Sequence, residues 1–367
     1  MDWINIHNEE YNYLTYPSFM VPKFLGCVMP GKEKKMIPNQ WYGILESKEV
    51  KLGKPVGVTR MGEKLVFWRD TQGQVTCQSD LCPHRGVALS AGKLQGDCIQ
   101  CPFHGFEYDS TGHCQLIPAN GKKATPPKAL QVRTYPAREA HDLIYIWWGE
   151  PRAEYPELPW FDSLHDNDFS YFTIRDHWTN HYSRAIENQL DVVHLPFVHH
   201  NTIGRENKAL VNGPRMKVEE REGRNDILNI WFDNEVDQGQ TPIRADKLPE
   251  PQTHPLLQFC FPNIWQNWLG DKLRILIVFA PIDHENTLMY IRQYQSIVNL
   301  PLLRETFNLM GAIGNLIIER QDKRVVVTQR PKRTELRMEE KLIPGDGPII
   351  EYRRRREALI EADQEWR

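Results

Sequence analysis

Two short segments, each with one cysteine and one histidine, constrain the fold of this chain more than any other feature. They are Cys82-Pro83-His84-Arg85-Gly86 and Cys101-Pro102-Phe103-His104-Gly105, and sixteen residues separate His84 from Cys101. Each segment offers a thiolate and an imidazole on a tight loop. The prolines stiffen these loops, and the glycines permit backbone angles that other residues resist. Together the two loops can supply four ligands to a metal centre.

Zinc and an iron–sulfur cluster are the two alternatives for this ligand set. Zinc binds two Cys and two His in one tetrahedral site, whereas a [2Fe–2S] cluster of the Rieske type takes two Cys on one iron and two His on the other. Zinc fingers pair like ligands, but here each loop mixes them and would donate one ligand to each iron. The order favours a Rieske cluster on Cys82, His84, Cys101 and His104. Because Cys98 and Cys101 also form a Cys-x2-Cys pair, zinc stays open as the alternative.

The sequence around the two loops predicts a small all-β domain. Short runs such as Lys64–Trp68 and Leu143–Trp148 are separated by turn residues such as Asp70–Gly73, which is typical of closely spaced strands. Three prolines between 150 and 159 then indicate a boundary. We expect an N-terminal arm at residues 1–38, a Rieske domain at 39–150 and a second domain at 151–367.

The second domain mixes helical and strand patterns and is predicted to be α+β. Helices are expected at Ser183–Val193 and Leu302–Val327, and a final charged helix follows a loop that starts at Lys332. The strand-like runs between them are Ile227–Phe232, Leu257–Phe261, Leu273–Ala280 and Leu288–Tyr294.

A second metal constellation lies in this domain. Asp191 and His194 are three residues apart, which predicts a shared helical face, and His199 follows five residues after His194. Because Pro196 disfavours helical geometry at Leu195, we expect the helix to end there and a turn to deliver His199. A non-haem Fe(II) oxygenase site needs two His, one carboxylate and open positions. The carboxylate is expected from Asp322 or Glu319, and His200 is the alternative to His199.

Composition excludes several function classes. The net charge of −3 gives no reason to expect nucleic acid or an acidic membrane as a partner. No apolar run reaches the roughly 18 residues of a membrane span, and seven cysteines are too few for a disulfide scaffold. We therefore expect a cytoplasmic protein without nucleic-acid or membrane partners. The basic run Arg353–Arg356 is interpreted as a solvated helix face.

With these residues in place, the chain resembles a Rieske non-haem iron oxygenase, the catalytic (α) subunit of aromatic ring-hydroxylating and demethylating systems, in its homotrimeric branch. The resemblance covers about residues 40–330. It rests on the two loops, on Glu187-Asn188-x-x-Asp191-x-x-His194-x4-His199 and on Glu319-x-x-Asp322. It implies a helix-grip (Bet v1-like) catalytic domain with an antiparallel sheet and iron bound by His194, His199 and Asp322. It also implies a head-to-tail trimer in which Asp191 bridges His194 to His104 of a neighbouring subunit.

The reaction implied is mono- or dioxygenation of a small organic substrate, aromatic or heterocyclic, with O2. Electrons would come from NAD(P)H through a separate reductase, with or without a ferredoxin, because the chain has no glycine-rich dinucleotide pattern after a strand. The alternative is a Rieske electron-transfer protein without a working mononuclear iron site. An apolar substrate pocket would be lined by Phe259, Phe261, Ile264, Trp265, Trp268 and Leu276, although aromatic residues at strand spacing more often form plain core. Asn263, Gln266 and Arg292 are the expected polar contacts to a substrate.

Overall fold

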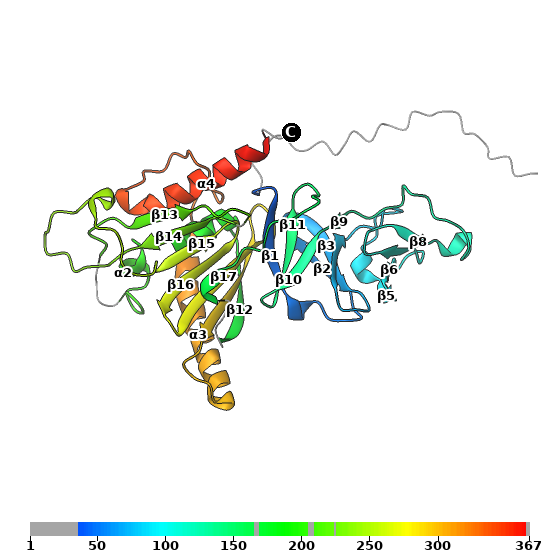
Figure 1. Cartoon of the computed structure of the whole chain (residues 1–367), viewed down its shortest axis with the longest axis horizontal. Helices are drawn as coiled ribbons and strands as arrows, with labels where there is room; N and C mark the ends of the chain where they lie inside the picture. The colour runs from blue at the N-terminus through cyan, green and yellow to red at the C-terminus, as the bar shows by residue number, and fades with distance from the viewer. Residues whose placement is uncertain (1–35, 165–168, 205–208, 224, 365–367) are drawn as a thin grey trace, which may run out of the picture. The chain divides into compact units, whose positions relative to one another are not determined.

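The first part of the chain forms three small antiparallel sheets (Figure 1). A computed structural model describes residues 36–164, 169–204, 209–223 and 225–364, so most of the predicted arm, 1–38, lies outside the described residues. The sheet orders are β1-β11-β10, β2-β3-β4-β9 and β5-β6-β7-β8. The strands are β1 (Gln40–Glu46), β2 (Val56–Arg60), β3 (Glu63–Arg69), β4 (Val75–Ser79), β5 (Lys93–Gln95), β6 (Cys98–Gln100), β7 (Glu107–Asp109), β8 (Cys114–Leu116), β9 (Thr134–Tyr135), β10 (Ala137–Ala140) and β11 (Leu143–Trp148).

The rest of the chain is built on a seven-stranded antiparallel sheet in the order β12-β18-β17-β16-β15-β14-β13. Its long central strands are rich in β-branched and aromatic residues, which pack well on a pleated surface. The strands are β12 (Ser170–Trp178), β13 (Arg215–Glu219), β14 (Ile227–Trp231), β15 (Leu257–Cys260), β16 (Ile264–Gly270), β17 (Leu273–Pro281) and β18 (Thr287–Gln295).

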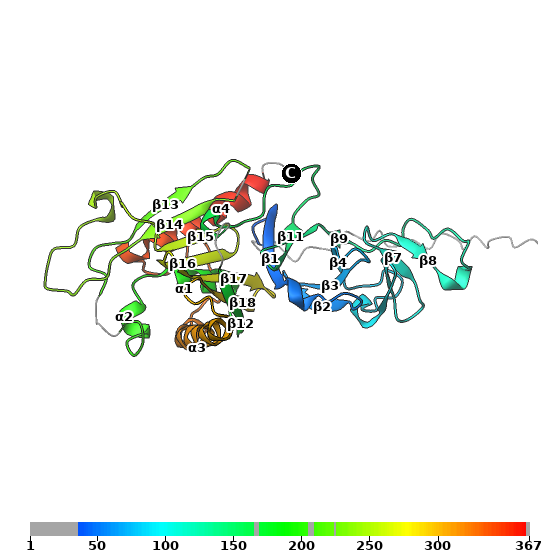
Figure 2. The same cartoon turned by 60° about the horizontal axis from the view of Figure 1, so that its bottom comes forward.

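Helices cover one face of this sheet. The long helix α3 (Pro301–Val326) lies against β12 and β18, and α4 (Gly347–Gln364) lies against β13 and β14 (Figures 1 and 2). Helix α1 (Tyr182–Leu190) contacts both of these helices and β17. A sheet with helices on one face confirms the predicted α+β class and the helix-grip architecture. No helix of the described residues is long and apolar enough to span a bilayer.

The opposite face of the sheet contacts the N-terminal sheets through buried polar side chains. Arg292 Nη1 donates to His141 O at 2.7 Å, and Asn263 Nδ2 donates to Gly43 O at 2.8 Å. Because side chains of a strand alternate between faces, residues one position away from these point toward the helices instead. This alternation determines which side chains of the sheet reach the candidate site.

The helix predicted for Ser183–Val193 is shorter than expected. Helix α1 ends at Leu190, Asp191 is its C-terminal cap, and a separate turn of helix, α2 (Leu195–Val198), holds Pro196 near its start. Asp191 Oδ1 accepts hydrogen bonds from Val193 N at 2.7 Å and His194 N at 3.3 Å. These two bonds form a turn in which the side chain of Asp191 takes the place of helical hydrogen-bond partners. The prediction that Asp191 and His194 share a helical face, with the helix ending at Leu195, is therefore wrong.

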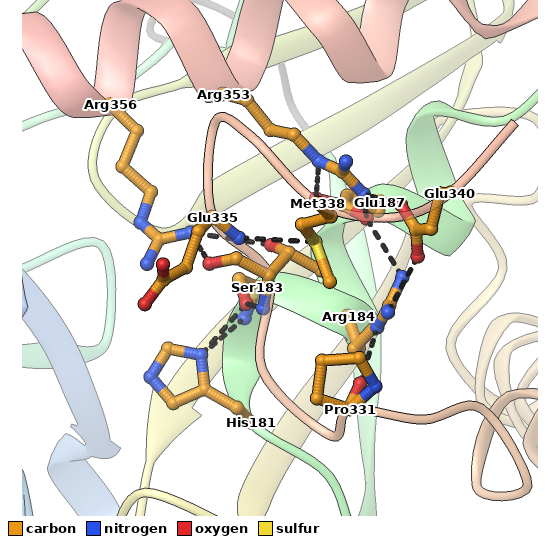
Figure 3. A network of polar contacts seen from close by, with 11 residues as sticks. His181, Ser183, Arg184, Glu187, Pro331, Glu335, Met338, Glu340, Arg353 and Arg356 are labelled. Carbon is orange, nitrogen blue, oxygen red and sulfur yellow. Dashed lines mark hydrogen bonds and ion pairs between the residues drawn. The ribbon is translucent and has the colours of Figure 1, made fainter. Parts of the chain in front are cut away.

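The predicted solvated face at Arg353–Arg356 is also wrong for two of its four residues. Arg353 and Arg356 of α4 are 3% and 4% exposed, whereas Arg354 points outward. Residues three apart lie on one side of a helix, so Arg353 and Arg356 point inward together. Arg355 is half-buried and pairs with Asp226 and Glu220. Figure 3 shows the inward pair directed at polar groups of α1 and of the segment 331–340.

Candidate metal centres and the adjoining cavity

The two Cys/His loops come together in the N-terminal sheets. One loop follows β4 and the other connects β6 to β7, and both cysteines are buried in one hydrophobic cluster with Trp68, Ile99 and Tyr108. Gly86 and Gly105 have φ of 71° and 72°, as their predicted role requires. Their N–H groups donate to Cys82 O and Cys101 O and so close each loop.

The arrangement of these side chains fits a two-iron cluster. The Cys82 and Cys101 thiols point into the core, whereas the rings of His84 and His104 are exposed with centroids 4.7 Å apart. The two buried thiols and the two exposed imidazoles thus form two like pairs, which fits a cluster with the cysteines on one iron and the histidines on the other.

The remaining cysteines of this region are not part of the group. Cys98 lies on β6, and burial together with nearby carboxylates raises the pKa of its thiol to about 11. Cys77 is fully buried, and burial raises the pKa of its thiol as well. Cys98 also lies outside the buried cluster that holds Cys82 and Cys101, so the Cys98–Cys101 pair gains no support as a zinc site.

His194, His199 and Asp322 form a second group of donors. Their ligand atoms all lie within 4.8 Å of one another. The two imidazole Nε2 atoms are 3.2 Å apart, and Asp322 Oδ1 lies 3.3 Å from His194 Nε2 and 3.1 Å from His199 Nε2. Asp322 Oδ1 is buried and accepts no hydrogen bond. An orphaned carboxylate oxygen facing two imidazole nitrogens fits one metal ion held by three ligands on one side.

The local structure explains why these three meet. His194 and His199 flank α2 at its two ends, and Asp322 is delivered by the buried side of α3. Glu319, the predicted alternative carboxylate, is not in the group and receives long 3.4 Å contacts from Gln189 Nε2. His200 is exposed, and its Nδ1 contacts Phe197 O at 2.9 Å instead. The geometry favours Asp322 over Glu319 and His199 over His200.

A neighbouring carboxamide orients the ring of His199, whereas His194 Nδ1 makes no hydrogen bond to the described residues. Gln321 Oε1 lies 2.8 Å from His199 Nδ1 and also accepts a 2.9 Å hydrogen bond from Thr202 Oγ1. An acceptor at Nδ1 fixes the tautomer that leaves Nε2 free for a metal. On the other ring, Asp191 Oδ1 lies 3.7 Å from His194 Nδ1. The roles of Gln321 and Thr202 could not be predicted from the sequence, because nothing in it distinguishes them from other polar residues near a ligand.

Charges in the group are strongly coupled. Burial alone would lower the pKa of His194, but Asp191 and Asp322 outweigh it and raise that pKa to about 9. Burial would raise the pKa of Asp322, but the two imidazoles hold it below its ordinary value. Burial and the nearby Asp322 together raise the pKa of Glu319. Asp191 and Asp322 thus favour positive charge beside His194.

A buried ionic cluster anchors helix α1, which leads into Asp191. Glu187 accepts hydrogen bonds from Arg353 Nε at 2.7 Å and Nη2 at 2.8 Å, and Arg184 Nη1 lies 3.4 Å away (Figure 3). Glu340 pairs with both Arg184 and Arg353 at 2.7 Å. The cluster ties α1 to α4 and to the segment before it. Sequence reasoning missed it, because these partners are far apart in the chain.

A cavity of about 200 Å³ adjoins the second donor group. Apart from the three candidate ligands, its wall is formed by apolar side chains, carboxamides and the carboxyl groups of Asp191 and Glu319, which come from α1, α3, β15, β16, β17 and β18 and from the neighbouring loops. The apolar members are Val192, Leu195, Ile203, Phe232, Leu257, Trp265, Leu269, Ile275 and Ile318.

Most residues predicted for a substrate pocket do not line this cavity. Of that set only Trp265 does. Gln266 bonds Gln258 and Ser163, and Arg292 bonds the backbone of His141 and Asp142 on the opposite face of the sheet. Asn267 and Gln293, each one position further along the same strands, line the cavity instead. The error is one of strand phase, since a shift by one residue exchanges the two faces.

Each of the two parts of the chain matches a known protein family. Residues 40–136 match the Rieske [2Fe-2S] domain, and residues 178–362 match the vanillate O-demethylase oxygenase C-terminal domain. The iron-sulfur subunit TsaM1 of the toluene-4-sulfonate monooxygenase system of Comamonas testosteroni is 32% identical over 47% of this chain and 49% of its own length. The oxygenase component of dicamba O-demethylase of Stenotrophomonas maltophilia is 34% identical over 44% of this chain and 48% of its own length.

Among solved structures, Pseudomonas putida CBB5 NdmA with caffeine superposes with a TM-score of 0.70 at 22% identity, over 89% of this chain and 92% of that one. At this identity the likeness shows the fold alone. The matches span between 20% and 49% of the length of the curated relatives. The assignment of the chain to a family rests on the two family models. The donor group of two His and one Asp is typical of Rieske oxygenases. The chain belongs to the Rieske non-haem iron oxygenases, as a catalytic (α) subunit of the vanillate demethylase-like family.

Proposed function

We propose that this chain is the oxygenase component of a system that uses O2 and electrons from NAD(P)H to hydroxylate or oxidatively demethylate a small organic molecule. A separate reductase, with or without a ferredoxin, delivers the electrons. The observation that carries the proposal is the convergence of His194, His199 and Asp322 beside a cavity, in a chain that also presents two Cys/His loops. Both similar enzyme components named above, one of a monooxygenase and one of a demethylase, support this class of reaction.

Each group of residues has a defined task in this proposal. Cys82, His84, Cys101 and His104 hold a [2Fe–2S] cluster, and His194, His199 and Asp322 hold one iron. Together these two groups supply single electrons and O2 activation when bound. Gln321 keeps the ring of His199 oriented. The carboxylate of Asp191 lies 3.7 Å from His194 Nδ1. The apolar wall around Trp265 and Ile318 excludes water from the reacting position.

The proposal includes a homotrimer in which neighbouring subunits complete the electron path. His84 and His104 are exposed, so a second molecule can approach the ring nitrogens that face away from the cluster. The side chain of Asp191 is 28% exposed and reaches the outside while it stays close to His194. Asp191 is thus proposed to bridge His194 to His104 of the next subunit. The cytoplasmic location stays a prediction.

The test is low-temperature EPR of anaerobically reduced, iron-replete protein before and after exposure to nitric oxide. The proposal expects a Rieske signal together with a high-spin iron–nitrosyl signal. A Rieske signal alone would contradict a working mononuclear site and favour the electron-transfer alternative. Absence of both signals would contradict both metal assignments. NAD(P)H-dependent O2 consumption with a reductase then tests the reaction itself.

A further inference from the structure

The wall of the cavity is unusually rich in carboxamides. Five of the residues that line it carry one, and they come from α1, β16, β18 and α3: Asn188, Gln189, Asn267, Gln293 and Asn315. A cavity made for a plain hydrocarbon would not need them, because every buried amide without a partner costs free energy. Side-chain amides present both a donor and an acceptor to a ligand.

Several of these amides have unused hydrogen-bonding capacity. Asn267 projects from β16 between Leu257 and Ile275, its neighbours on the adjacent strands, and its side chain makes no hydrogen bond to the described residues. Asn188 Nδ2 is buried and likewise has no partner there. Gln293 Oε1 accepts from Asn315 Nδ2 at 3.1 Å, which leaves the Gln293 NH2 and the Asn315 carbonyl free to bind a ligand.

The cavity offers no cation to a negatively charged substrate. No lysine or arginine is among the described residues that line it, and its carboxyl groups are Asp191, Glu319 and Asp322. A divalent iron at the donor group would be balanced by Asp191 and Asp322. The site with its metal therefore carries no net positive charge that would attract an anion. An organic carboxylate or sulfonate would lose its hydration without gaining a counter-charge.

We propose that this cavity selects a neutral one- or two-ring molecule with an amide- or lactam-type edge, held by Asn267 and by the Gln293–Asn315 pair. The inference rests on the proposed function, since it takes the cavity as the substrate site. A volume of about 200 Å³ suits a ligand of that size, below the roughly 300 Å³ at which pockets for drug-sized ligands begin. Trp265 and Ile318 cover the faces of the ring, while the carboxamides pair with its polar edge.

A matched pair of probes tests the selection, because 4-methoxybenzamide and 4-methoxybenzoate share one shape and differ in charge. Their dissociation constants are measured by calorimetry on the anaerobic, full-length, iron-loaded protein at pH 7.5. The amide should bind at least tenfold more tightly than the carboxylate. It should also change the EPR signal of the iron–nitrosyl adduct, which places the amide beside the donor group.

Variants of the cavity wall connect the preference to named residues. Asn267→Leu should weaken amide binding at least fivefold with little effect on the carboxylate, and Asn267→Arg should reverse the preference. Gly311→Ala is a second, steric test. A Cβ at Gly311 would lie 2.1 Å from Gln293 Nε2, so the amide of Gln293 must shift and the preference should shrink. Gln72→Ala, in an exposed turn of the N-terminal sheets, is the control and should change nothing.

Three results would overturn the inference: equal or tighter binding of the carboxylate, no amide binding at millimolar concentration, or a preference that survives in both Asn267 variants. The EPR test of the two iron centres needs no substrate. If both iron signals are present while the probe experiment fails, the inference about substrate class is wrong and the proposed function stands.

Discussion

Arg353 of α4 holds the carboxylate of Glu187 in α1 with two parallel hydrogen bonds, Nε to Oε1 at 2.7 Å and Nη2 to Oε2 at 2.8 Å. Both side chains are buried, and they connect the C-terminal helix to the helix that ends at Asp191. The position of Asp191 and His194 thus depends on a segment about 160 residues further along the chain.

We expect Arg353→Met to lower the free energy of unfolding by about 3–5 kcal/mol, because it leaves Glu187 buried without its main partner. Urea unfolding followed by circular dichroism measures the loss. Arg354→Met in the same run, where the side chain is exposed, should stay within about 0.5 kcal/mol of the wild type. The double variant Arg353→Met, Glu187→Gln should recover part of the loss. Equal destabilisation at positions 353 and 354 would refute the role of the pair.

Asp191→Asn should keep both metal centres and lower turnover by about a hundredfold or more, the order of loss expected for a group that supports a metal-bound imidazole. The amide oxygen of Asn can still accept from Val193 N and His194 N, so the turn that presents His194 should survive. Iron content and EPR check the metals, and stopped-flow oxidation of the reduced cluster checks electron transfer. Normal turnover in this variant would eliminate the bridging role.

Removal of the carboxylate at Asp322 should remove the mononuclear iron only. We expect Asp322→Ala to lose about one iron atom per chain while the Rieske EPR signal stays, because the two sites use separate ligands. Glu319→Gln is the matched control. Glu319 is outside the donor group, and Gln has the same size, so iron should be retained. Loss of iron in Glu319→Gln but not in Asp322→Ala would exchange the two assignments.

Cys98 should behave as a free but unreactive thiol. Its pKa of about 11, raised by burial and by nearby carboxylates, leaves about 0.1% thiolate at pH 8, against about a quarter for an ordinary cysteine. Iodoacetamide labelling read by peptide mass spectrometry should be more than about a hundredfold slower than in denatured protein and should rise about tenfold per pH unit up to pH 10. If the Cys98→Ser variant lost metal, the result would support the zinc alternative, in which Cys98 is a ligand.

The ligand types and their spacing determined much of this protein without any structure. Mixed Cys/His loops with proline and glycine at fixed positions predicted the cluster domain, because such loops are local and their backbone angles are set by the residues themselves. The same holds for His194 and His199, five residues apart on either side of a short turn. Strand and helix patterns likewise predicted the α+β class, since periodicity is a local property.

Only the tertiary structure decided what depends on partners from distant segments. It placed Asp322 rather than Glu319 at the histidines, although both lie on the buried side of α3. It buried Arg353, whose partner lies in another helix. Strand phase placed Asn267 and Gln293 in the cavity and their neighbours Gln266 and Arg292 on the opposite face. When both faces of a sheet are covered, both carry buried polar residues, so the sequence alternation alone cannot identify the face that meets the metal.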